Sequence, residues 1–193
     1  MKKQNLFLVI SIIFVVFLLT TGCGGSPTAP PLTYTVGDTG PAGGLIFYDK
    51  GSDSDGWRYL EAAPVSTEWE KPWGSLENDF YGETETSIGS GQNNTTIIVT
   101  WLNSHSETGK AAQLCNDLIV GGYNDWFLPS RGELNLIYTN LKVAGVGGFA
   151  DDNYWSSSEI DTDYAWAQYF YNGSQYTEWK ANANYRVRAV RSF

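Results

Sequence analysis

The chain has 193 residues, of which 42% are hydrophobic and 17% are charged, so it has enough apolar side chains to form a core. This length suits one globular domain with ancillary segments and is too short for two ordinary domains. The formal net charge of −9 argues against nucleic acid as a partner. One histidine and two cysteines are too few for a zinc cluster or a disulfide framework, and no P-loop or GxGxxG string is present. We therefore expect no cofactor.

The N-terminus has the pattern of an export signal. Lys2 and Lys3 precede an apolar run of about 14 residues, which is shorter than the roughly 20 that a transmembrane helix needs. The LTTGC string that ends this run at Cys23 resembles the lipobox of bacterial lipoproteins. The resemblance implies lipidation of Cys23 and anchoring at the bacterial outer membrane or cell surface. The alternative is an ordinary signal peptide that leaves Cys23 as a free thiol.

The segment after Cys23 contains the string GGSPTAPP and has nothing to bury, which predicts a short flexible tether. The expected organisation is a signal peptide over residues 1–22, a lipidated cysteine with its tether over 23–33, and one domain over 34–193. Lipidation of Cys23 would leave Cys115 without a disulfide partner. Because Cys115 lies on an apolar helical stripe, we expect it to be a buried small hydrophobic residue and not a reactive thiol.

The domain pattern is strands, then helices, then strands, which defines an α+β class. Strands are expected at 43–48 and 57–62, paired antiparallel across a loop at 51–56, and again at 154–158, 165–171, 175–180 and 185–191. Residues 65–91 show no clear period and predict an irregular loop. Three helices are expected: one after Asn94, one between Ser106 and Gly121, and one starting at Ser130, where an S-x-x-E string predicts a capping box.

Several separated strings carry a family resemblance. They are GDTGPAGG at 37–44, GWRYLEAAP at 56–64, GGYNDWFLPSRGEL at 121–134, YWSSSE at 154–159 and VRAVR at 187–191. In this order they resemble the DUF1566 family, also known as the C-terminal domain of the Legionella collagen-like adhesin, over nearly all of residues 34–193. The resemblance implies a C-type-lectin-like fold, close to the variant of formylglycine-generating enzymes, and a role in adhesion and ligand binding on bacterial surfaces. Because fold does not settle function, the sites need separate evidence.

The sequence predicts no metal site. The sugar-site strings of calcium-dependent lectins, Glu-Pro-Asn or Gln-Pro-Asp followed by Trp-Asn-Asp, do not occur. The loop at 51–56 lacks the first and twelfth carboxylates of an EF-hand. Four further acidic residues lie close to Tyr154 in the sequence, and we expect them to be solvated. They are Asp151, Asp152, Asp161 and Asp163.

No catalytic residue is assigned. A formylglycine-generating oxidase needs paired cysteines, whereas the mature chain would keep only Cys115. His105, the one histidine, lies between two predicted helices and is expected to be a surface or cap residue. The alternative that stays open is a carboxylate-based glycoside hydrolase or another carbohydrate-active enzyme, since 21 acidic residues and eight tryptophans suffice to build such a site.

Tyrosine and asparagine concentrate near the C-terminus. A period of two along 166–171 places Trp166, Gln168 and Phe170 on one face, expected to pack, and Ala167, Tyr169 and Tyr171 on the other. Tyrosine and tryptophan offer large, rigid contact areas, as in antibody binding loops. We therefore expect this segment to bind an extracellular glycan or protein. The predicted ligand-binding residues are Tyr164, Tyr169, Tyr171, Tyr176, Trp179, Asn182, Asn184 and Tyr185.

Four basic residues lie beside this segment and fit either of two roles. They are Lys180, Arg186, Arg188 and Arg191. One role is to bind an anionic ligand such as a sulfated glycan, and the other is to form buried ion pairs.

The same segment resembles the variable regions of proteins diversified by diversity-generating retroelements. In such regions adenine-directed mutagenesis of asparagine codons yields Tyr, Asp, Ser, Thr, Ile and Ala between fixed motifs. The positions that fit are 160–164, Ala167, Tyr169, Tyr171, Tyr176 and 181–185. The alternative is an ordinary, undiversified adhesin with a tyrosine-rich face.

Overall fold

A computed structural model of the chain describes residues 32–74 and 82–193. Residues 33–193 form one compact unit that mixes strands with helices, so the predicted α+β class is confirmed. The predicted signal peptide, Cys23 and most of the predicted tether lie outside the described residues. Within the described residues, no helix is both long and apolar enough to cross a bilayer.

The first sheet has the strand order β1-β2-β8 and is antiparallel. β1 (Leu45–Ser54) and β2 (Trp57–Ala62) form the expected hairpin, and β8 (Val190–Ser192) adds the end of the chain to it. The loop between the two strands is shorter than the predicted range 51–56, because β1 continues to Ser54. The turn is formed by Asp55 and Gly56, whose φ angles of 55° and 81° place both residues in the left-handed region.

The second sheet has the strand order β3-β7-β4-β5-β6. β4 (Asn153–Glu159), β5 (Tyr164–Tyr169) and β6 (Ser174–Trp179) form an antiparallel meander that matches three predicted strands. The strand predicted at 185–191 is instead divided between the sheets, with β7 (Arg186–Val187) in this one and β8 in the first. The segment predicted as an irregular loop contains a 3₁₀ turn (Val65–Thr67) and β3 (Trp69–Glu70). The sequence does not predict β3, because two residues are too few to show the period of a strand.

The three predicted helices are present as α1 (Gly91–Ser104), α2 (Ala111–Asn116) and α3 (Arg131–Ile137), and α3 continues as a π turn (Tyr138–Lys142). α2 ends earlier than its apolar pattern suggests, because Val120 and Tyr123 exchange backbone hydrogen bonds around a turn at Gly121 and Gly122. The capping box of α3 is confirmed: the Ser130 hydroxyl accepts from the Glu133 amide (3.2 Å), and the Glu133 carboxylate accepts from the Ser130 amide (2.7 Å).

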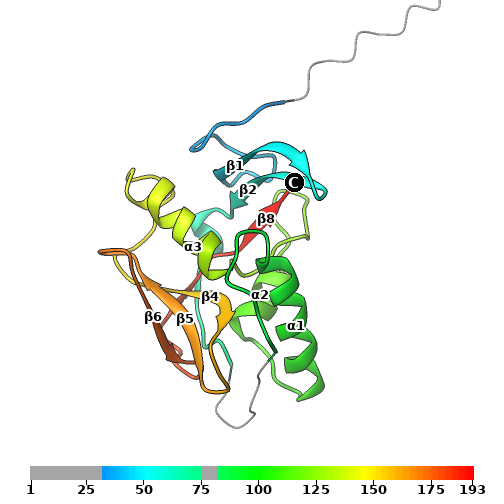
Figure 1. Ribbon diagram of the computed structural model, residues 1–193, viewed down its shortest axis with the longest axis vertical. Coiled ribbons are helices and arrows are strands. Elements are labelled where there is room, and N and C mark those ends of the chain that lie inside the picture. The colour runs from blue at the N-terminus through cyan, green and yellow to red at the C-terminus, as the bar shows by residue number, and fades with distance from the viewer. Residues whose placement is uncertain (1–31, 75–81) are drawn as a thin grey trace, which may run out of the picture. The chain divides into compact units, whose positions relative to one another are not determined.

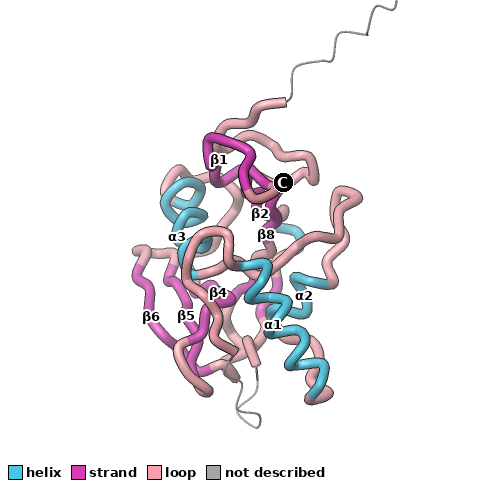
Figure 2. Tube along the Cα trace, turned by 45° about the vertical axis from the view of Figure 1, so that its right-hand side comes forward, coloured by secondary structure: helices cyan, strands magenta, loops and turns pink. Residues whose placement is uncertain are grey.

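Two apolar clusters lie on opposite faces of β4. Trp155 packs with residues of α1 and α2, whereas its neighbour Tyr154 packs with residues of α3 and of the first sheet. This alternation follows from the period of two along a strand. Figure 1 shows α3 and the α1–α2 pair on different sides of β4, and in both Figures 1 and 2 the β5–β6 hairpin extends away from α1 and α2. β6 is therefore an edge strand, and its side chains are half-buried or exposed.

Candidate functional site

The strings at 37–44 and 56–64 build a buried structural contact. The side chain of Glu61 is fully buried, and its carboxylate accepts hydrogen bonds from the backbone amides of Ala42 (3.1 Å) and Gly44 (2.8 Å). It also pairs with Arg191 at 3.3 Å. A Cβ atom at Gly40 would lie 2.5 Å from the Glu61 carboxyl carbon, so only glycine fits there. These strings therefore hold the loop before β1 against β2.

The strings at 121–134 and 154–159 also build the scaffold. Glu133 is buried and accepts hydrogen bonds from the backbone amides of Ser130 (2.7 Å) and Gly89 (2.8 Å), so it joins the start of α3 to the loop before α1. Burial raises the pKa of the Glu133 carboxyl, and these amide donors oppose the rise. Ser156, Ser157 and Ser158 are fully buried and bonded to neighbouring segments.

The open alternative of a hydrolase gains no support from the buried carboxylates. Glu133 lines a cavity of about 260 Å³ together with Trp57 and Phe127, yet both of its oxygens bind backbone amides. Glu61 is held by amides and an arginine, and Glu159 by Lys180 at 2.7 Å. Each of these three buried carboxylates thus has a structural role.

The four basic residues near the C-terminus take the second of their two predicted roles, in ion pairs. Arg188 and Lys180 are almost fully buried and pair with Glu68 and Glu159, respectively. Arg191 binds Asp125 through two hydrogen bonds of 2.8 Å, in addition to its contact with Glu61. Arg186 contacts Glu68, Glu70 and Asp152. These four cations therefore do not form a free basic surface for a sulfated glycan.

The acidic residues near Tyr154 are engaged individually. Asp151 pairs with Lys142 at 2.6 Å, Asp152 pairs with Arg186, and Asp161 accepts from the amides of Asp163 and Tyr164. Over residues 32–74 and 82–193, no cluster of three or more histidine, cysteine or acidic side chains is arranged to hold a metal ion.

The remaining predictions on single residues concern Cys115 and His105. Cys115 is fully buried as a free thiol, as predicted, and burial raises its pKa. His105 is exposed at the C-terminal cap of α1, where its ring stacks on Trp101 with a centroid distance of 3.9 Å. This is the surface or cap position that the sequence predicts.

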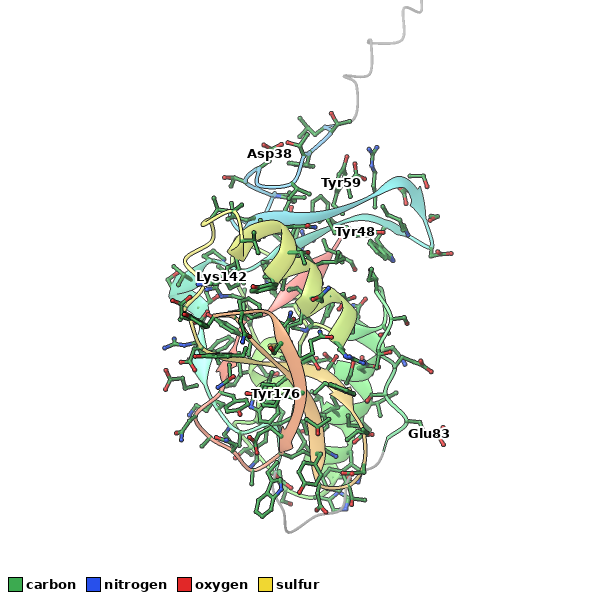
Figure 3. The ribbon with its side chains drawn as sticks, turned by 60° about the vertical axis from the view of Figure 1, so that its left-hand side comes forward. Asp38, Tyr48, Tyr59, Glu83, Lys142 and Tyr176 are labelled. Atoms are coloured by element: carbon green, nitrogen blue, oxygen red, sulfur yellow. The ribbon has the colours of Figure 1, made fainter. Side chains whose placement is uncertain are left out.

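Five of the predicted ligand-binding residues lie on the β5–β6 hairpin, on both of its faces or in its turn, and Asn182, Asn184 and Tyr185 lie in the segment after β6. Strand register pairs Tyr164 with Trp179 on one face, whereas Tyr176 pairs with Ala167 on the other. Tyr171 and Trp179 are 68% and 52% exposed. Asn184 is exposed as well, and the side chains of Tyr164, Tyr169, Tyr176 and Asn182 are half-buried. Figure 3 labels Tyr176 on this hairpin.

Tyr185 differs from the rest of the predicted set, since it is only 7% exposed. Its ring packs on Trp155 at a centroid distance of 4.7 Å, and its hydroxyl donates to Glu178 (2.9 Å) and lies 2.9 Å from the Tyr176 hydroxyl. Burial is the main cause that raises the pKa of Tyr185, and it likewise raises that of Tyr176. Tyr185 thus belongs to an internal network and does not face solvent.

The face of the hairpin that carries Trp179 adjoins the start of α3. The Arg131 guanidinium lies over the Trp166 ring, 3.7 Å from its centroid, and donates from Nε to Gln175 at 2.9 Å. Tyr164 and Trp179 meet edge to face at 6.2 Å and are joined by a hydrogen bond from the Trp179 indole to the Tyr164 hydroxyl. We name Arg131, Tyr164, Trp166, Thr177 and Trp179 the aromatic surface.

Sequence reasoning missed Arg131 and expected Trp166 to be packed, whereas it is half-buried beneath this arginine. The S-R-G-E string that contains Arg131 predicts a helix cap and gives no signal for the contact with Trp166. The prediction that Phe170 packs is confirmed, since it is fully buried.

Comparison with curated proteins gives no match. Among solved structures, a fimbrial protein from Bacteroides ovatus aligns with 16% identity and a TM-score of 0.45. The alignment covers 78% of this chain and 36% of the fimbrial protein, so the chain spans little more than a third of that protein's length. The sequence profile of the Lcl C-terminal domain matches residues 67–191, which leaves the strings at 37–44 and 56–64 outside the match. Because this match covers more than half of the chain, the protein belongs to the Lcl C-terminal domain family.

Proposed function

We propose that the protein is an adhesin-like surface protein that binds a glycan or protein ligand through its β5–β6 hairpin. Membership of the Lcl C-terminal domain family is consistent with an adhesin-like surface protein. The observation that carries the proposal is the exposure of Trp179 and Tyr171, whereas the polar side chains of Glu61, Glu133 and Ser158 in the scaffold strings are buried and hydrogen-bonded. Large exposed aromatic residues are typical anchors of binding surfaces.

The proposal includes an anchor and places the protein at the cell surface. A lipid on Cys23 would tether the domain to the bacterial outer membrane or cell surface, with residues 24–33 as the spacer. The proposed fold variant is the C-type-lectin-like one of formylglycine-generating enzymes, and it rests on the sequence strings. The protein acts by binding and not as an enzyme.

Retroelement diversification is part of the proposal. Exposure of Tyr171 supports it, because a surface position tolerates the Asn-codon replacements. Ala167 and Tyr185, which are buried, are the positions where such replacement would disturb packing. A neighbouring reverse transcriptase gene and a near-copy of the 3′ end of this gene, differing at adenines, would support diversification. Absence of both would leave an ordinary adhesin.

The binding proposal is tested on glycan and extracellular-protein arrays with the purified chain. Trp179→Ala and Tyr171→Ala should each weaken the affinity for the ligand with the strongest array signal by about ten-fold or more. Truncation of an aromatic anchor in an interface lowers the binding free energy by about 1–2 kcal/mol or more. Ile119→Ala is the matched control, because Ile119 is 74% exposed and lies outside the hairpin. The proposal would be contradicted if all three variants bound as strongly as the unaltered chain. It would also be contradicted if only Ile119→Ala lost binding.

A further inference from the structure

Arg131 differs from the other arginines of the described residues. Arg58, Arg186, Arg188 and Arg191 each have a carboxylate oxygen at 2.5–2.8 Å. Arg131 is half-buried and has no ion pair with any described carboxylate, although the chain has a formal net charge of −9. A guanidinium that is fixed in place and has no carboxylate partner has the geometry to bind an external carboxylate through paired hydrogen bonds.

The Arg131 side chain is held in position from two sides. Trp166 lies beneath the guanidinium plane, and Gln175 accepts from Nε at 2.9 Å while its own side-chain amide donates to the Arg131 carbonyl at 3.0 Å. Among the described residues, the Nη1 and Nη2 groups have no hydrogen-bond acceptor. These are the groups that bind a carboxylate through two parallel hydrogen bonds. The preformed position lowers the entropic cost of binding such a group.

The surroundings of Arg131 suit a sugar ring. Trp166 and Thr177 are paired across β5 and β6, and Tyr164 and Trp179 form the next pair on the same face. Trp179 is 52% exposed, so its ring is available to a ligand that touches Arg131. The electron-rich face of an aromatic ring attracts polarised C–H groups, which line the faces of a sugar. The Thr177 hydroxyl adds a donor and an acceptor on the same face.

The charge balance limits the ligand to a single anionic group. The neighbouring basic residue Lys180 is buried against Glu159, and Arg186 is surrounded by Glu68, Glu70 and Asp152. On this face a polyanionic chain would meet the Arg131 guanidinium beside many acidic groups and be repelled.

We propose that the aromatic surface binds a sugar that carries one carboxylate, such as a hexuronic or nonulosonic acid, with Arg131 holding the carboxylate and Trp179 packing on the ring. This inference rests on the proposed function and names its ligand class. An acidic peptide would offer the same carboxylate without the sugar ring.

The test measures binding of sodium D-glucuronate and of N-acetylneuraminate to the purified full chain by titration calorimetry. D-Glucuronamide is the uncharged counterpart, and a short aspartate peptide represents the alternative ligand. We expect the acids to bind at least ten-fold more tightly than the amide, and Arg131→Gln to remove this preference. Arg131→Lys should recover only part of it, because an ammonium lacks the planar pair of donors. Arg58→Gln is the matched control and should keep the preference, since Arg58 pairs with Asp49 in the β1–β2 hairpin.

The preference for acid over amide is a ratio within one variant, so a change in stability does not imitate it. Equal affinity for acid and amide in the unaltered chain, or an intact preference in Arg131→Gln, would overturn the inference. Arg131-dependent binding of the peptide without binding of either sugar would overturn it as well. If the inference fails but Trp179→Ala still weakens binding of an array ligand, the proposed function stands. If Trp179→Ala changes nothing on the array either, the proposed function fails too.

Discussion

Phe170 and Tyr171 are neighbours in the chain with opposite surroundings. Phe170 is fully buried, and its ring centroid lies 4.3 Å from that of Tyr154 and 5.6 Å from that of Phe149. Tyr171 is 68% exposed and contacts the ring of Tyr169. The sequence predicts this difference from the period of two, because that pattern is local. It does not predict the burial of Tyr185, since that depends on contact with Trp155, which lies on β4 far earlier in the chain.

Truncation of these two neighbours should therefore have different effects on stability. Phe170→Ala should lower the free energy of unfolding by about 3–5 kcal/mol, because it leaves a cavity in the core. Tyr171→Ala should change it by at most about 0.5 kcal/mol. Urea denaturation of both variants measures the two values. If Tyr171→Ala unfolds as readily as Phe170→Ala, the assignment of an exposed hairpin face is wrong.

Cys115 reports on the packing of the apolar cluster around Trp155, which lies between the second sheet and the α1–α2 pair. The thiol is fully buried there, and burial raises its pKa, so the protonated form should persist well above neutral pH. In the Cys23→Ser variant, we expect an aromatic disulfide reagent at pH 8 to leave Cys115 unmodified until urea unfolds the chain. Labelling of the folded variant at the rate of the unfolded chain would show that the thiol is accessible.

At the scale of elements, α3 connects the scaffold to the aromatic surface. It has seven residues before its π turn, so it is too short to be stable alone and depends on its cap and on packing. Ser130 caps it and also donates from its hydroxyl to the Ser87 carbonyl at 2.7 Å. The sequence predicts this cap because the S-x-x-E string is local. It does not predict the role of Arg131, which depends on Gln175, 44 residues further along the chain.

Removal of the cap should weaken the fold measurably. Ser130→Ala should cost about 1 kcal/mol of unfolding free energy, since the amides of the first helical turn lose their acceptor. Ser104→Ala is the control, because Ser104 is exposed at the end of α1. The midpoint of urea denaturation measures both variants. Equal midpoints for the two would show that the capping box does not contribute to stability.

The division of the C-terminal strand between the two sheets also lies beyond the reach of the sequence. β7 has two residues and β8 has three, and each takes its place from a partner far along the chain. A two-residue strand has no period to detect, and β7 pairs with β3 and β4, while Arg186 and the nearby Arg188 form ion pairs with Glu68. By contrast, the β1–β2 hairpin and the β4–β5–β6 meander were predicted because their strands are longer and follow one another.

At the scale of the whole molecule, we propose a lipid anchor on Cys23 and a ligand-binding surface on the β5–β6 hairpin of the domain. Lys2, Lys3 and the apolar run before Cys23 predict export and lipidation. Metabolic labelling with a palmitate analogue should mark the unaltered protein and leave Cys23→Ser unmarked. Equal labelling of the two proteins would rule out a lipid on Cys23.

We propose that the β5–β6 hairpin, together with Arg131 at the start of α3, binds the ligand, and that the other residues of the quoted strings build the scaffold. Hydrogen–deuterium exchange of the full chain, with and without the strongest array ligand, tests it without assuming which residues matter. We expect the ligand to slow exchange in β5, β6 and the start of α3, and to leave α1, α2 and the β1–β2 hairpin unchanged. Protection centred on α1, α2 or the β1–β2 hairpin, with none in β5 and β6, would contradict the account.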